Sequence, residues 1–113
     1  MSKGLLMALS NPISPARDKE FNNWYDSVHA SEVAALPGIN SVTRYRTVVQ
    51  LNPPSEQPAY RYLAIYELDD IDTAVKALQT SISQMNMSDS MDLQGAQVIA
   101  YEPIFHRAKT DGA

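Results

Sequence analysis

SPARDKEFNNWYDSVHASEVAALPG, residues 14–38, is the stretch that decides the fold, because it reads as one long amphipathic helix with both ends marked. Ser14 is a good capping residue, Pro15 suits the first helical position, and Pro37-Gly38 ends the helix. Side chains recur at three- and four-residue spacing, the pattern of one buried stripe, at Phe21, Trp24, Tyr25, Val28 and Glu32 or Leu36. We therefore expect a helix over residues 14–36.

Four strands and a second helix are expected around this helix. Buried or alternating apolar runs predict strands over residues 3–10, 38–51, 59–68 and 95–108, the last interrupted by Pro103. Three prolines in NPPSEQP (52–58) predict a loop between the second and third strands. Residues 69–85 open with acidic caps and carry apolar residues at helical spacing, so they predict the second helix. A polar loop, residues 86–95, follows as a candidate mobile segment or lid.

The resulting order, β-α-β-β-α-β, is that of a ferredoxin-like α+β fold, with a four-stranded antiparallel sheet carrying both helices on one face. The opposite face would present tyrosine and aliphatic side chains. Such a face needs a cover, most simply the same face of a second subunit, so we expect a homodimer. Residues 1–108 are expected to form a single domain, and residues 109–113 a flexible tail.

Composition excludes several classes of protein. A net charge of −4, with nine scattered lysines and arginines, disfavours nucleic acid as a partner. The absence of cysteine rules out disulfides, thiol nucleophiles and cysteine-based zinc sites. The opening MSKGLLMALSNP has too short an apolar run for a signal peptide or a membrane span, so a cytoplasmic protein without a membrane partner is expected.

Residues 11–46, followed by YRYLAIYEL (60–68), resemble the dimeric α+β barrel superfamily and, within it, the EthD-like small proteins. The most specific part is F-x-x-W-Y-x-x-x-H, residues 21–29, followed by a Pro-Gly turn. The resemblance covers most of residues 3–106, although the strands match only as a pattern. It implies a barrel formed by two subunits, with a pocket between the sheet and the first helix of each. Members include polyketide cyclases, monooxygenases, lactone isomerases, haem-dependent enzymes and proteins without a known reaction, so fold is implied more strongly than function.

Within such a pocket, His29 is the candidate general acid or base, because histidine titrates near neutral pH. Tyr25 lies four residues earlier, on the same flank of the helix, and is the candidate that orients it. The structural alternative is that His29 only packs against Tyr25 or caps a carbonyl near the helix end. Trp24 is either an aromatic wall for a flat ligand or, more commonly for such residues, part of the core.

Other candidates for binding a ligand come from the strands. Tyr62 and Tyr66 share a face, so their hydroxyls could hold an enolate or carbonyl oxygen, or else pack at the dimer interface. Arg44 could clamp a carboxylate or phenolate, or pair with a glutamate across the sheet. Asn11 orients a ligand or forms a turn before Pro12.

These residues favour an enzyme without a cofactor, a cyclase, isomerase or lyase, acting by proton transfer on a hydrophobic aromatic or polyketide-like carbonyl compound. Two histidines far apart disfavour a metal site. The alternatives are a cofactor-free or haem-dependent monooxygenase on the same fold, and a protein that binds a hydrophobic metabolite without turning it over.

Overall fold

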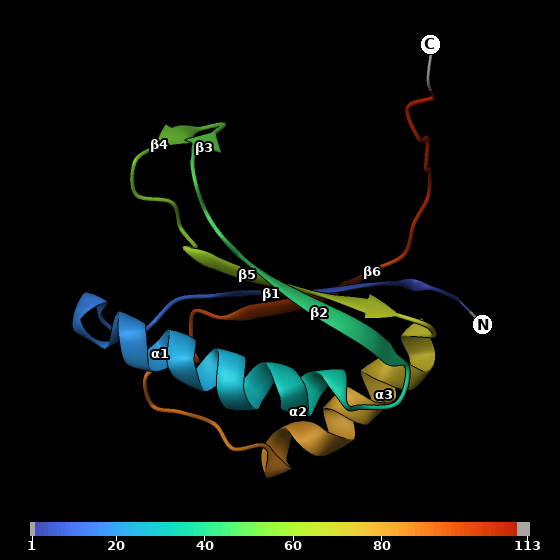
Figure 1. The fold of residues 1–113 in the computed structure, drawn as a ribbon, viewed down its shortest axis with the longest axis horizontal. Coiled ribbons are helices and arrows are strands. Elements are labelled where there is room, and N and C mark those ends of the chain that lie inside the picture. The colour runs from blue at the N-terminus through green and yellow to red at the C-terminus, as the bar shows by residue number, and fades with distance from the viewer. Residues whose placement is uncertain (1, 111–113) are drawn as a thin grey trace.

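The protein is described here by a computed structural model covering residues 2–110, which has one four-stranded antiparallel sheet with its helices on one face (Figure 1). Its strands are β1 (Gly4–Ser10), β2 (Ile39–Arg46), β5 (Tyr62–Leu68) and β6 (Gln97–Tyr101), in the order β2-β5-β1-β6. Every neighbouring pair is antiparallel. The predicted ferredoxin-like α+β fold is therefore confirmed.

The first helix is not regular along its length. It runs from Pro15 to Ala34 through a 3-10 turn (Pro15–Arg17), α1 (Asp18–Trp24), a π-helical turn (Tyr25–His29) and α2 (Ala30–Ala34). The backbone N–H of Ala30 donates to the carbonyl of Tyr25, five residues back. Periodicity predicted an ordinary helix here, and π-helical turns within α-helices are frequent at functional sites.

Gly38 connects this helix to β2 in a conformation that only glycine adopts readily. Its φ is +84°, and a Cβ there would lie 2.7 Å from the backbone nitrogen of Ala74. The helix-to-strand turn is thus packed directly on α3 (Ile71–Ser81). At the start of α3, the carboxylate of Asp70 accepts a hydrogen bond from the Thr73 N–H, as the predicted acidic cap requires.

The core lies between the helices and the sheet. It contains alternate residues of β1 and β5, which point toward the helices, and the buried stripe of the first helix. Its largest buried side chains are Phe21, Tyr25, Tyr62 and Tyr66. This position of the core follows from the period-2 alternation of the strands, since Leu6, Ala8 and Ser10 are buried while Leu5 is exposed.

The segment between α3 and β6 is fastened to the first helix at several points. The Trp24 indole N–H donates to the carbonyl of Asn86 at 2.7 Å, and Arg17 pairs with the Asp89 carboxylate at 2.6 Å. Met91, further along the segment, is buried in the core. The predicted polar loop thus carries both apolar and hydrogen-bonded anchors.

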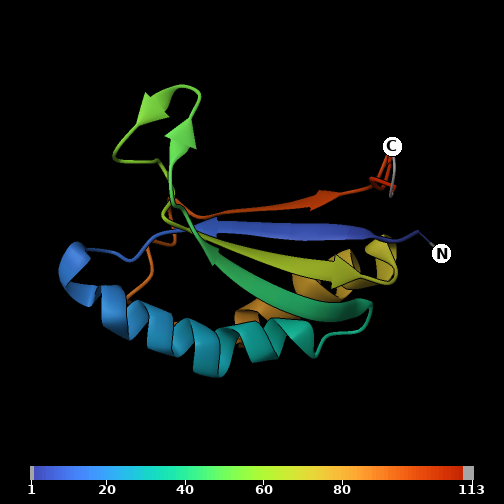
Figure 2. The same cartoon turned by 45° about the horizontal axis from the view of Figure 1, so that its top comes forward.

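Two extensions rise from the sheet on the side away from the helices (Figures 1 and 2). One is a hairpin of β3 (Gln50–Leu51) and β4 (Pro54–Ser55), and the other is the chain after Tyr101. The sequence prediction was wrong in both places: β2 ends at Arg46 rather than continuing to residue 51, and β6 ends at Tyr101 rather than 108. The alternation of apolar and polar residues does not show at which residue the hydrogen bonds between neighbouring strands end. Of the expected tail 109–113, residues 111–113 lie outside the described residues.

Candidate functional site

Three rings on the first helix form the centre of the candidate site. Trp24 stacks on His29, with ring centroids 4.8 Å apart and planes 17° from parallel. Tyr25 meets the same imidazole edge-on, with centroids 5.0 Å apart. The predicted neighbours Trp24, Tyr25 and His29 are therefore brought together, and the π-helical turn is the backbone that carries Tyr25 and His29.

His29 is buried, with 8% of its surface exposed, and its Nδ1 has no hydrogen-bond partner among residues 2–110. Burial lowers the pKa of the imidazole below its ordinary 6.5; Glu32 opposes this shift and Arg44 adds to it. A neutral imidazole at neutral pH can accept a proton. His29 thus satisfies the electrostatic condition for a general base, and it has a free ring nitrogen.

Two tyrosine hydroxyls lie close to each other beside His29. Burial raises the pKa of Tyr66 far above its usual range, and the neighbouring Tyr25 raises it further. Burial likewise raises the pKa of Tyr25. Although the two phenols are near enough to perturb each other, the Tyr66 hydroxyl has no properly aligned hydrogen-bond partner among the described residues. Both phenols therefore keep their protons at physiological pH.

Arg44 reaches this cluster from β2. Its guanidinium lies 4.2 Å from the centre of the Tyr25 ring, donates to the Asp26 carboxylate at 2.7 Å and donates to the Asn22 side chain at 2.9 Å. Its partners are thus on the first helix, not across the sheet. Its Nε is buried and unpartnered. Arg44 therefore places a fixed positive charge beside two phenols and an imidazole.

A cavity of about 40 Å³ lies next to His29 and Tyr66, between the helices and the sheet. Its other lining residues are all apolar: Leu6, Ala8, Val33, Leu78, Ile82 and Val98. This volume holds about one or a few water-sized groups, so it can receive the reactive end of a ligand and not a whole aromatic molecule.

Two predicted ligand-binding residues lie away from this cavity. Tyr62 shares the face of Tyr66, as predicted, but its hydroxyl donates to the Asp18 carboxylate at 2.6 Å. Asn11 accepts a hydrogen bond from the Arg61 N–H and donates to the Ala59 carbonyl, so its side chain joins the end of β1 to the approach to β5. Both residues have structural partners, and neither touches His29.

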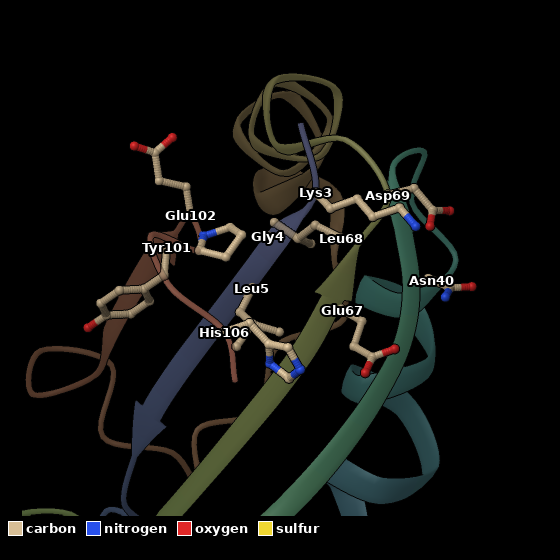
Figure 3. A pocket seen from close by; sticks show the side chains of 11 residues that line it. Lys3, Gly4, Leu5, Asn40, Glu67, Leu68, Asp69, Tyr101, Glu102 and His106 are labelled. Carbon is tan, nitrogen blue, oxygen red and sulfur yellow. The ribbon is translucent and has the colours of Figure 1, made fainter. Parts of the chain in front are cut away.

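Two larger hollows lie elsewhere on the molecule. One of about 560 Å³ is bounded by Leu5, Glu67, Tyr101 and the exposed His106 (Figure 3). Another, of about 800 Å³, lies beside the β3–β4 hairpin. The residues that line these two hollows carry no buried unpartnered polar atom of the kind found at His29 and Tyr66. We therefore assign the candidate site to the smaller cavity.

Asn22 and Asp26 were missed by the sequence analysis, although both hold Arg44. The available signal was their four-residue spacing, which places two polar side chains on one flank of the helix beside Tyr25. Among residues 2–110, no three histidine, aspartate or glutamate side chains gather where they could hold a metal ion. Within the same residues, none of the helices has the length and apolarity needed to cross a membrane.

No family model matches the sequence, and no curated protein matches it. Solved structures do match. A proposed monooxygenase from Shewanella loihica shares 14% identity at a TM-score of 0.65, covering 94% of this chain and 99% of that one. An EthD-family protein from Bacillus halodurans shares 14% identity at a TM-score of 0.59, and the match covers 92% of this chain and 100% of that one. A dabb-family protein with a ferredoxin-like fold from Mesorhizobium loti shares 11% identity at a TM-score of 0.61, and the match covers 93% of this chain and 100% of that one. At such identities the likeness establishes the fold: the chain has the ferredoxin-like fold found in EthD-family and dimeric α+β barrel proteins.

Proposed function

We propose that the protein is a small enzyme that moves protons on a hydrophobic carbonyl compound, using side chains alone. The observation that carries this proposal is a cavity lined by both His29 and Tyr66, whose buried Nδ1 and hydroxyl oxygen each lack a hydrogen-bond partner among residues 2–110. An aromatic or polyketide-like compound with an acidic C–H beside its carbonyl fits this pairing. The reaction class is isomerisation, cyclisation or elimination.

In the first step, His29 removes a proton from the carbon next to the carbonyl; the electron pair of that C–H bond forms a C=C bond with the carbonyl carbon, and the C=O π pair moves onto oxygen to give an enolate. The Tyr66 hydroxyl donates a hydrogen bond to the enolate oxygen. Arg44 stabilises the developing negative charge at a distance, because its Nη1 and Nη2 already bind Asp26 and Asn22. The imidazolium then returns the proton to another carbon or to a leaving oxygen.

Hydrogen–deuterium exchange tests this step without knowledge of the natural substrate. Acetophenone is incubated with the protein in D2O, and loss of its methyl proton signal is followed by NMR. We expect wild-type protein to accelerate the loss, and His29→Ala to reduce the acceleration at least about 100-fold, the ordinary contribution of a general base. His106→Ala is the matched control and should keep the wild-type rate, since His106 is exposed and remote from the cavity. Equal rates for His29→Ala and wild type would refute the proposal.

A protein that binds a hydrophobic metabolite without turnover is the second candidate. It is supported by the small volume of the cavity and by the hydrogen bonds that already occupy Arg44. It predicts that acetophenone binds wild type while deuterium exchange stays at the uncatalysed rate. A monooxygenase, as proposed for the Shewanella protein, would instead consume oxygen with a phenolic compound, which an oxygen electrode detects.

We also propose a homodimer. The face of the sheet opposite the helices carries Leu5, Tyr45 and Tyr101, each between one third and one half exposed. The extensions on the same side add Val48, 95% exposed, and Phe105, 80% exposed. A second copy placed on this face would cover all five, because the hairpin and the C-terminal segment rise on either side of it (Figure 1). Apolar surface of this extent favours association.

A further inference from the structure

The size of the His29 cavity limits how a ligand can lie in it. At about 40 Å³ it admits a carbonyl group and its adjacent carbon, and the rest of the molecule must extend out of the cavity. The direction of that extension is set by the lining residues that reach solvent. This inference rests on the proposed function for the statement that a carbonyl is the inner end of the ligand. The route by which the ligand enters is argued from the cavity and its lining residues.

Only two lining side chains are substantially exposed among the eight. Ile82, in the turn after α3, is 44% exposed, and Val98, on β6, is 54% exposed. The other six are buried or half-buried. Since β6 is the edge strand of the sheet, no further strand covers Val98 on its outer side. Among the lining side chains, these two are therefore the ones at which the cavity meets the solvent.

The main chain around these two side chains is fixed. The backbone of β6 is paired with β1, and the segment after α3 is held by Trp24 and by Glu32, which accepts hydrogen bonds from both the backbone and the side chain of Asn86. A ligand therefore passes between the two side chains without lifting the backbone. The volumes of residues 82 and 98 decide the width of the group that enters.

We propose that Ile82 and Val98 form the entrance of the His29 cavity and select its ligands by width. No charged residue lines the cavity or the entrance, so the ligand is uncharged along this path, with a narrow apolar body and one oxygen at its inner end. Burying a charge there without a partner would be costly, whereas an apolar group gains by leaving water. The selected class is thus a neutral, flat or linear ketone or aldehyde.

The test measures binding by isothermal titration calorimetry, with acetophenone as the narrow probe and 2-acetylnaphthalene as the wide one. Val98→Phe and Ile82→Phe narrow the entrance from its two sides, and each should weaken binding of both probes at least tenfold. Ile82→Ala widens it and should improve the affinity for 2-acetylnaphthalene relative to acetophenone at least threefold. Both positions are about half exposed, so these variants are expected to fold.

Matched controls make the same changes elsewhere. Val48→Phe lies on the hairpin, and Ile13→Ala lies before the first helix; neither residue lines the cavity. Both should bind the probes as wild type does. The proposal is overturned if both narrowing variants bind normally, if the controls shift equally, or if neither wild type nor Ile82→Ala binds either probe.

Binding and exchange together separate this inference from the proposed function. If entrance variants shift probe affinity but no protein accelerates deuterium exchange, the entrance stands and the enzyme proposal fails. If His29→Ala abolishes exchange while Val98→Phe and Ile82→Phe change neither binding nor exchange, the enzyme proposal stands and the entrance fails.

Discussion

Trp24 lies nearly parallel to His29, with 4.8 Å between ring centroids, and it is the only tryptophan of the chain. The tryptophan fluorescence of the protein therefore comes from a ring in contact with the candidate base. An imidazolium quenches indole emission more strongly than a neutral imidazole does, so protonation of His29 can be followed optically.

Trp24 emission should fall on acidification with a midpoint below pH 6.5, because burial lowers the pKa of His29 from that value. The measurement is a fluorescence titration between pH 8 and pH 4. His29→Gln should abolish the transition, and His106→Gln should leave it in place. A midpoint at or above 6.5 would contradict the burial argument.

The same shift predicts how stability depends on pH. Below pH 6.5 the unfolded chain binds a proton at His29 while the folded protein, whose His29 pKa is lower, does not, so acidification favours unfolding. The free energy of unfolding, measured in urea, should therefore fall as pH decreases from 6.5 toward the folded pKa, and His29→Gln should show a smaller fall across that window. An equal fall in both proteins would remove His29 as its cause.

Replacing Arg44 should destabilise the fold. Arg44→Ala removes two charge-assisted or polar hydrogen bonds and the contact with the Tyr25 ring, for a loss of about 2 kcal/mol in the free energy of unfolding. Arg44→Lys should recover only part of it, since an ammonium cannot reproduce the planar fork. Arg61→Ala is the matched control: its half-exposed side chain lies 3.8 Å from Asp18, and its loss should cost less than about 0.5 kcal/mol. Similar losses for the two alanine variants would show that the Arg44 contacts contribute little.

Gly38→Ala should destabilise the protein by at least about 1 kcal/mol, because the residue has a left-handed backbone and packs on α3. Thermal unfolding followed by circular dichroism measures this. Gly95→Ala provides the comparison, since its φ is not positive and only the Asp92 side chain must move. An unchanged Tm for Gly38→Ala would mean that the turn relaxes at no cost.

The dimer can be tested at the extensions. Phe105→Asp and Val48→Asp should each shift sedimentation from twice the chain mass toward the single chain, because they place charge where apolar contact is expected. Ile13→Asp changes a half-exposed residue in the connection between β1 and the first helix and should sediment as wild type. A wild-type protein with the mass of one chain would refute the dimer directly.

Sequence reasoning recovered the fold because each element carries a strong periodic signal. The alternation of Leu6, Ala8 and Ser10, and the stripe through Phe21 and Tyr25, are both buried as the pattern requires. The β3–β4 hairpin was missed because Pro54 argues against a strand, although a two-residue pairing tolerates it.

The site was recovered only in part. Tyr25, His29 and Trp24 could be grouped because they are neighbours on one helix, and helical spacing fixes their relative positions. Which strand residues face them depends on the sheet register and on side-chain partners. Tyr66 reaches the His29 cavity, whereas Tyr62, on the same face, turns to Asp18. No pattern in the sequence distinguishes these two tyrosines.

The π-helical turn at Tyr25–His29 has a consequence for changes in chain length. A π-turn holds one residue more than an α-turn, so deleting one of its exposed residues, such as Ser27, would leave an ordinary α-helix. The faces carrying Phe21 before it and Val33 after it would keep their alignment with the sheet. Such a deletion would change the surroundings of the imidazole while sparing the rest of the core. The helix thus has one place where insertion and deletion can reshape the site without rebuilding the fold.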